Sequence, residues 1–194
     1  MLKKAIYYFF VFPYYKWKLG GIGRRSWLVH SKVQGHKRIW IGQNVYINDR
    51  TWLACLPFED HQAALRIGDG SYIGRFCHFY ATSRIEIGKK VLIADKVYLA
   101  DNQHGFKDIT IPVIDQPVTQ TAPVIIDDGA WLGENVCVIG ARVGKQSVVG
   151  ANSVVLKDIP DYCIAAGAPA RIIRRYSFEK KEWLRTDENG AFLI

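Results

Sequence analysis

The stretch that decides the fold, residues 123–155, reads PVIIDDGAWLGENVCVIGARVGKQSVVGANSVV. An aliphatic residue recurs in it at steps of six, with one step of five, at Ile126, Leu132, Val138, Val143, Val149 and Val155. A period of six fits neither the 3.6-residue period of a helix nor the alternation of a simple hairpin. Such a short repeat predicts a coil of three flat strands, with a corner after every six residues.

The residue types around each aliphatic position fit this coil. The aliphatic side chain is expected to point into the coil, and a small residue or valine four positions later prevents overfilling at the corner. Glycine or asparagine at a corner tolerates the positive φ that a tight turn needs. The repeat extends over residues 41–58, 67–104 and 124–160, which is most of the chain.

The repeat resembles that of the hexapeptide-repeat acyltransferases, of the sugar and polysaccharide O-acetyltransferase type. This resemblance implies a mainly β fold, a left-handed parallel β-helix of triangular section with a protruding loop and a C-terminal helix. The handedness is taken from the resemblance alone. Because the same helix also carries metal enzymes and scaffolds, the repeat by itself does not choose the function.

Three segments are predicted along the chain. Residues 1–25 form an aromatic and basic N-terminal segment, and residues 26–165 form the β-helix, with a protruding loop at residues 105–123 that carries three prolines and no repeat. Residues 166–194 are expected to form a basic helix and a tail. We expect the helix, over residues 171–185, to cover the end of the coil, where strand edges are otherwise exposed.

Composition limits the partners and the compartment. The 194 residues fit one domain with appendages, and their net charge of +8 is compatible with a nucleic acid, an anionic membrane or a polyphosphate cofactor. No nucleic acid is expected, because only the charge supports one and no groove-reading motif is present. The four cysteines lie far apart without a CxxC pair, which favours buried reduced thiols and a cytoplasmic location.

The first 19 residues combine eight aromatic side chains with four lysines and no acidic residue. Their apolar run is shorter than the ~20 residues needed to span a bilayer. Aromatic residues flanked by lysines suit a membrane interface. A segment packed on the β-helix or on a neighbouring subunit has the same composition, so both interpretations stay open.

His104 is the candidate catalytic residue, because it ends a coil just before the long loop. Histidine exchanges a proton near neutral pH. In a purely structural interpretation His104 and Asn102 are polar turn residues. The resemblance implies more: in these O-acetyltransferases an Asp-x-x-His-Gly-aromatic sequence closes a coil, and its histidine is the general base. Here the motif is Asp101, His104, Gly105 and Phe106; many relatives carry a second histidine where this chain has Asn102.

The reaction implied by the resemblance is transfer of an acetyl group from acetyl-CoA to a sugar hydroxyl, in surface polysaccharide or glycan biosynthesis. The length of one coil places Arg84 one coil below His104, where it is expected to shape the acceptor site. Asp101 is a candidate for orienting the imidazole, although a backbone carbonyl serves equally well.

The resemblance also assigns cofactor contacts. Trp131 is placed beside the acyl-transfer site, Ala151 and Lys157 along the groove for the pantetheine, and Arg171 and Arg174 at the nucleotide phosphates, which suit charge-assisted contacts. A tryptophan packed between subunits and arginines on a solvated face are the structural alternatives.

Two departures from the family pattern affect this groove. The coil that begins at Val138 is one residue short, and Glu134 stands where relatives often have serine or alanine.

Other functions remain open on the sequence alone. An N-acetyltransferase of an amino sugar or an antibiotic acyltransferase has the same repeat. A metal-dependent β-helix carbonic anhydrase needs three histidines that meet between subunits, and the five histidines here lack the close spacing of such a site. No metal is therefore expected. The resemblance implies a homotrimer with the active site between two subunits and a carbohydrate acceptor. The cysteines favour a cytoplasmic location, and the N-terminal segment is compatible with the inner face of the membrane.

Overall fold

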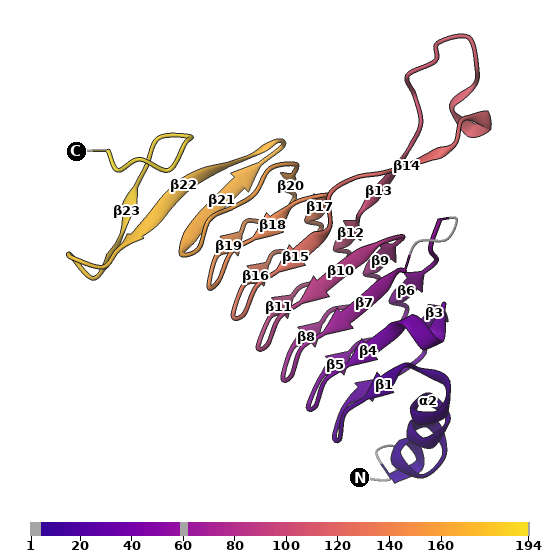
Figure 1. The fold of residues 1–194 in the computed structure, drawn as a ribbon. Helices are drawn as coiled ribbons and strands as arrows, with labels where there is room; N and C mark the ends of the chain where they lie inside the picture. The colour runs from indigo at the N-terminus through magenta and orange to yellow at the C-terminus, as the bar shows by residue number, and fades with distance from the viewer. Residues whose placement is uncertain (1–4, 59–61, 194) are drawn as a thin grey trace.

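The computed structural model describes residues 5–58 and 62–193, and short β-strands dominate it. The chain visits three parallel sheets in turn, so that each circuit adds one strand to each sheet (Figure 1). We call these sheets faces A, B and C. The mainly β, parallel coiled architecture predicted from the six-residue repeat is confirmed.

Each face contains one strand from every coil. Face A consists of β1 (Gly21–Ile22), β4 (Ile39–Ile41), β7 (Ala64–Ile67), β10 (Arg84–Ile87), β15 (Val124–Ile126) and β18 (Arg142–Val143). Face B begins with β2 (Trp27–Leu28), β5 (Tyr46–Ile47), β8 (Tyr72–Ile73), β11 (Leu92–Ile93), β16 (Trp131–Leu132) and β19 (Val148–Val149). Face C consists of β3 (Lys32–Gln34), β6 (Trp52–Cys55), β9 (His78–Ala81), β12 (Tyr98–Ala100), β17 (Cys137–Ile139) and β20 (Val154–Val155).

The core lies inside the coil, as the repeat predicts. All six aliphatic residues of the deciding stretch are completely buried, and so are the small residues at its corners, Ala130, Ser147 and Ser153. The buried serines accept or donate hydrogen bonds between coils; Ser147, for example, donates to the Pro160 carbonyl at 2.7 Å. A single column of apolar side chains therefore holds the coils together.

The corners turn through residues with positive φ, in most coils at the two corners that flank face B. The corner between faces A and B uses Asn44, Gly70 and Lys90 at equivalent positions, and the corner between faces B and C uses Lys96 and Asn135. Glycine and asparagine were expected here, but lysine, arginine, glutamine and aromatic residues take the same conformation. The corner site is open to solvent, so its long side chains project outward.

The N-terminal segment covers the first coil. A π-helix, η1 (Tyr7–Val11), continues into α2 (Phe12–Lys18), and β1 then joins face A beside β4. Strand β1 therefore lies inside the predicted N-terminal segment 1–25. None of the helices in the described residues is long and apolar enough to cross a membrane.

The predicted C-terminal helix is wrong. Residues 171–185 form two antiparallel strands instead: β21 (Cys163–Gly167) extends face B, and β22 (Ala170–Ser177) and β23 (Glu182–Arg185) follow it. The last parallel strand leaves an unpaired edge, and a strand that folds back satisfies its backbone groups directly. The basic residues therefore lie on an extended strand, where tertiary pairing overrides helix propensity.

The predicted loop at residues 105–123 does leave the coil (Figure 1). Its base is a two-stranded hairpin of β13 (Asn102–His104) and β14 (Val118–Gln120), and its tip holds a short 3₁₀ helix, η3 (Val113–Asp115). Apolar side chains at the tip face solvent, with Ile109 98% exposed and Ile114 85% exposed. An exposed apolar tip on a protruding arm suits contact with another protein surface.

Candidate active site

His104 lies at the base of the protruding hairpin. It is the last residue of β13, opposite Val118 on β14, and its side chain is exposed. Gly105 follows, and its N–H donates to the Pro117 carbonyl at 2.9 Å. A Cβ at Gly105 would lie 2.6 Å from that carbonyl oxygen, so only glycine allows the hairpin to close here. In the described residues the imidazole has no hydrogen-bond partner, so it is free to meet a substrate.

Asp101 fixes the root of this hairpin. Its carboxylate is completely buried, and its Oδ1 accepts hydrogen bonds from the Thr82 N–H at 2.7 Å and the Thr82 hydroxyl at 2.9 Å. Its Oδ2 accepts from the N–H groups of Ser83 and Arg84 at 2.7 and 2.6 Å. A buried carboxylate with four such donors is well satisfied. These contacts place Asp101 in a structural role, and in the described residues it makes no hydrogen bond to His104.

Two amides complete this cluster of polar side chains. Gln120, the last residue of β14, donates from Nε2 to the Asp101 carbonyl and accepts from the Thr82 hydroxyl at 3.0 Å. Asn102 is nearly buried and donates to the Tyr80 carbonyl at 3.1 Å. Both strands of the hairpin are therefore tied to the coil below, and the Asn102 side chain is used for this and not for the exposed site.

The backbone N–H of Arg84 donates to Asp101 at the base of the hairpin. Its side chain is half-exposed and pairs with Glu86 at 2.8 Å on face A, an interaction that raises the pKa of Arg84 and lowers that of Glu86. The structure thus brings the Arg84 backbone to Asp101, while its guanidinium is held by Glu86. Its role at the acceptor site stays a prediction.

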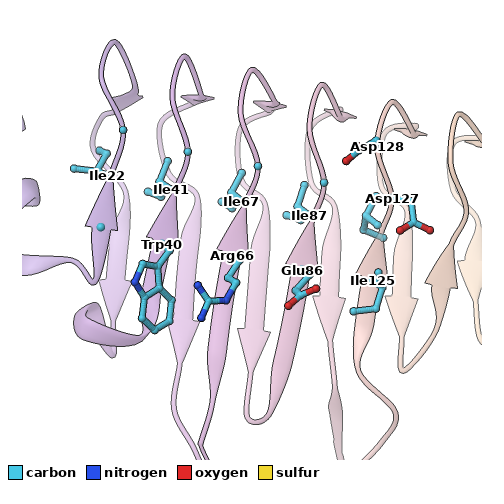
Figure 2. Close-up of a pocket in the computed structure, with 16 residues that line it drawn as sticks. Ile22, Trp40, Ile41, Arg66, Ile67, Glu86, Ile87, Ile125, Asp127 and Asp128 are labelled. Carbon is cyan, nitrogen blue, oxygen red and sulfur yellow. The ribbon is translucent and has the colours of Figure 1, made fainter.

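A groove of about 640 Å³ lies on face A (Figure 2). Figure 2 shows Trp40, Arg66 and Glu86 side by side on neighbouring strands, and the guanidinium of Arg66 stacks on Trp40 at 4.1 Å. None of the predicted site residues lines it. We do not place the chemistry there, because it contains neither an exposed histidine nor an unpaired nucleophile.

The predicted cofactor residues gather toward the C-terminal end of the coil. Strand register on face B aligns Trp131 with Val148, Val148 with Ile164, and Ile164 with Arg174. Partners in register point to the same side of a sheet, so Trp131 and Arg174 share one row. Trp131 is 47% exposed.

A β-bulge decides where the two arginines point. Arg171 pairs with Ala166 and Arg174 pairs with Ile164, with a register shift between them. Ala166 and Ile164 are two residues apart and lie on one side of β21. In a regular strand, residues 171 and 174 would point to opposite sides. The extra residue in β22 places Arg174 on the same side as Arg171. The expected helix would also have placed the two arginines on one side.

Lys157 and Arg171 are brought together by the return of the chain. Both line one pocket of about 280 Å³ with Ala170, Glu188 and Asn189. Arg171 Nε lies 3.6 Å from the Glu188 carboxylate, in an exposed pair. Ala151 lies at the turn after β19, and its backbone is so close to Gly133 that a Cβ there would lie 2.6 Å from the Ala151 nitrogen.

The structure also shows where the two departures from the family pattern lie, Glu134 and the short coil after Val138. Glu134 is paired with Lys96 at 2.8 Å at an exposed corner. The short coil turns at Gly140, whose φ is 55°, and a Cβ there would lie 2.7 Å from the Thr121 hydroxyl. The corner is therefore shaped by the strand that returns from the loop.

The cysteines do not offer a nucleophile. All four are free, and burial raises the pKa of Cys55 to about 11 and that of Cys77 to about 12. Such thiols stay protonated and unreactive. In the described part of the chain no three histidine, cysteine or acidic side chains are grouped so as to hold a metal ion.

Thr82 and Gln120 were missed by the sequence analysis. Thr82 is not an inward-pointing aliphatic position of the repeat and Gln120 lies in the loop, and these two residues bond to partners 19 residues away or more. Only the fold brings them to Asp101.

Comparison with known proteins identifies the family. No protein-family model matches the sequence. The chain is 38% identical over 154 residues to a probable acetyltransferase of Mycobacterium tuberculosis, covering 78% of this chain and 49% of that protein. It is 39% identical over 122 residues to the putative lipopolysaccharide biosynthesis O-acetyl transferase WbbJ of Escherichia coli, covering 59% of this chain and 62% of WbbJ.

A third relative decides the assignment. The chain is 30% identical over 135 residues to the putative colanic acid biosynthesis acetyltransferase WcaF of Escherichia coli, covering 69% of this chain and 68% of WcaF. A solved hexapeptide-repeat containing acetyltransferase of Vibrio cholerae, in complex with acetyl-CoA, is 26% identical with a TM-score of 0.62, over 84% of this chain and 75% of that one. The chain belongs to the hexapeptide-repeat acetyltransferases.

Two facts limit what family membership implies for this chain. This hexapeptide-repeat protein spans about half the length of the mycobacterial relative and 62% of WbbJ. The N-acyltransferase AntD of Bacillus cereus, solved with dTDP and 3-hydroxybutyryl-CoA, has a TM-score of 0.72 over 88% of this chain and 90% of AntD, at 21% identity. That likeness concerns the fold.

Proposed function

We propose that this protein is an acetyl-CoA-dependent O-acetyltransferase that acetylates a sugar hydroxyl in surface polysaccharide or glycan biosynthesis. The observation that carries the proposal is His104, an exposed imidazole on a hairpin whose root is fixed by Asp101. The assignment of WbbJ to lipopolysaccharide biosynthesis and of WcaF to colanic acid biosynthesis supports the acceptor class. The acetyl-CoA complex of the Vibrio acetyltransferase supports the donor.

In the proposed mechanism His104 is the general base. It accepts the proton of the sugar hydroxyl as that oxygen forms a bond to the acetyl carbonyl carbon. Acetyl-CoA supplies the activated acetyl group. As the carbon–sulfur bond breaks, His104 returns the proton to the departing thiolate sulfur, and the products are an acetyl ester and a free thiol. Asp101, Thr82 and Gln120 hold the hairpin, and so position His104 without touching the substrate.

The cofactor residues are proposed as a track along the upper part of face B. Trp131 marks the end nearest the chemistry, the small side chain of Ala151 lets the pantetheine chain approach, and Lys157, Arg171 and Arg174 meet the phosphates. Cations that converge at the end of a groove suit a polyphosphate. Arg84 is proposed to shape the acceptor side.

We also propose a left-handed coil and a homotrimer in the cytoplasm. The trimer is supported by the exposed apolar tip of the 105–123 loop, which suits a neighbouring subunit. The cytoplasm is supported by the four free cysteines.

An N-acyltransferase acting on an amino sugar is the second candidate, and the fold likeness to AntD favours it. One experiment separates the two. Purified protein is incubated with radiolabelled acetyl-CoA and matched sets of neutral sugars and amino sugars, and the products are then treated with mild base. An ester loses its label in base, whereas an amide keeps it. Labelling of amino sugars alone, stable to base, would replace the O-acetyltransferase proposal.

A further inference from the structure

The excess of positive over negative charge in this protein comes from its first 48 residues. The first 48 residues hold nine of the 26 lysines and arginines and none of the 18 acidic residues. The remaining 146 residues therefore hold 17 basic and 18 acidic residues, a formal charge of −1. The net positive charge thus comes from the first 48 residues, and of these the described residues 5–48 lie together at the N-terminal end of the structure (Figure 1).

One side of the N-terminal segment is fixed to the coil. Tyr7 of η1 is buried, its hydroxyl accepts a hydrogen bond from the Leu28 N–H at 2.9 Å, and its ring lies 4.2 Å from that of Trp27. Burial raises the pKa of Tyr7 to about 12, so the phenol stays neutral. Leu19, just after α2, is also buried. The segment is therefore part of the folded domain, and its position is set.

The other side of the same segment exposes large apolar side chains to solvent. They are Ile6 (48% exposed), Phe9 (79%), Phe10 (69%), Tyr14 (48%) and Trp17 (68%). Water-soluble surfaces rarely leave so many large apolar groups together. In the described residues the coil covers none of these five, so this face is available to a partner.

A basic pocket adjoins this aromatic face. It measures about 460 Å³ and lies between the end of α2 and the 3₁₀ helix η2 (His36–Arg38), lined by Trp17, Lys18, Gly35, His36, Lys37 and Arg38. Lys37 Nζ donates to the Trp17 carbonyl at 2.6 Å, which holds the two elements together. No acidic side chain lines it, and none of its cations forms an ion pair within the part of the chain that the structure describes.

We propose that this N-terminal end is a docking surface for an anionic lipid bilayer. The exposed aromatic side chains of η1 and α2 enter the headgroup region, where amphipathic aromatic residues are stable. Lys18 and Arg38 meet lipid phosphates at the adjoining pocket. A bilayer fits better than a protein partner, because the face combines exposed aromatic rings with a broad, unpaired positive charge.

The proposal places the candidate active site near the membrane surface. On face C, β12 is three strands from β3, the first strand of that face, so the hairpin that follows β12 lies about 14 Å along the coil from the first turn. A lipid-anchored acceptor is within reach at that height. The docking surface itself does not depend on the proposed reaction.

The test measures binding of the full-length protein to vesicles by co-sedimentation. Vesicles of phosphatidylcholine alone are compared with vesicles that also contain phosphatidylglycerol, at low and high salt. We expect binding to the anionic vesicles alone, weakened by salt. Lys18→Gln with Arg38→Gln should weaken it roughly 30-fold, since each basic residue near an anionic surface contributes about fivefold. Lys180→Gln with Lys181→Gln, which removes the same charge at the other end, should have little effect.

The aromatic face has its own variant. Phe9→Ser with Phe10→Ser should weaken binding roughly tenfold or more, whereas Phe178→Ser, a 65% exposed aromatic at the other end, should not. Circular dichroism and melting temperature confirm that each variant is folded. Point substitutions are used because deletion of residues 1–19 would remove the buried Tyr7 and Leu19.

Three results would overturn the proposal. The native protein does not bind anionic vesicles, or the Lys18/Arg38 variant binds them as well as the native protein does. In the third, the native protein is an oligomer in light scattering and the Phe9/Phe10 variant is not, while the variant still binds vesicles. The last outcome would make the face a contact between copies.

Discussion

Asp101 holds Thr82 by two hydrogen bonds to the same carboxylate oxygen, from the backbone N–H at 2.7 Å and from the side-chain hydroxyl at 2.9 Å. Thr82 belongs to the coil below, and Asp101 immediately precedes the strand that ends at His104. The contact therefore fixes the base of the hairpin to the rigid coil, whereas the rest of the hairpin extends into solvent.

This relationship predicts the effect of Asp101→Asn. An amide keeps one acceptor but turns a donor toward buried N–H groups, so we expect unfolding free energy to fall by about 2 kcal/mol. Turnover should also fall, while the Michaelis constant for acetyl-CoA changes little. Thermal melting and steady-state kinetics measure the two effects. Asp69→Asn is the control, because Asp69 likewise accepts a hydrogen bond from a neighbouring coil, from the Gln43 N–H at 2.7 Å, but lies away from the hairpin. Equal losses of turnover in both variants would show that Asp101 only stabilises the fold.

Replacement of His104 tests the proposed base. His104→Ala should lower turnover by roughly 10²–10⁴, the scale of general acid–base catalysis. Binding of acetyl-CoA, measured by calorimetry, should be nearly unchanged, because the imidazole is not a phosphate ligand. Gln103→Ala, at the neighbouring exposed position of β13, serves as the control and should retain activity. Near-normal turnover of the His104 variant would remove the mechanism.

Replacement of Lys157 or Arg171 tests the cofactor track. Each alanine variant should raise the Michaelis constant for acetyl-CoA more than it lowers turnover, because the contacts lie far from the reacting carbonyl. With a short acetyl thioester that lacks the nucleotide, the effect should shrink. Lys145→Ala, an exposed lysine outside the pocket, is the control. If both donors respond equally, the two residues have a structural role.

The oligomeric state tests the shared site. Light scattering should give the mass of a trimer at micromolar concentration. Ile109→Ser with Ile114→Ser, at the exposed tip of the loop, should weaken the assembly and lower activity together, because apolar contact area is lost at the interface. A native monomer with full activity would contradict a site between subunits.

The sequence by itself determined the coil. The six-residue period fixes which side chains point inward, and all six aliphatic residues at the repeat positions of the deciding stretch are completely buried. The period also locates the excursion at residues 105–123, because the repeat stops there, and it locates His104 at its edge. Each of these is a local pattern, which one sequence reveals.

The other features of the fold and of the candidate site depend on contacts between residues that are far apart in the sequence. The segment after residue 166 is basic and reads as a helix, yet the open edge of β21 draws it into β22, and a bulge then returns Arg174 to the side of Arg171. Thr82 lies one coil below Asp101, but its hydrogen bonds to the Asp101 carboxylate, and the return of Gln120 to the same residue after the loop, are seen only in the tertiary structure. The sequence likewise did not show which aromatic residues of the N-terminal segment pack on the coil and which face solvent. The structure shows that Tyr7 is buried and Phe9 is exposed. Periodicity determines which side of a strand is buried, whereas the partners of a side chain depend on where the chain returns, and only the tertiary structure decides that.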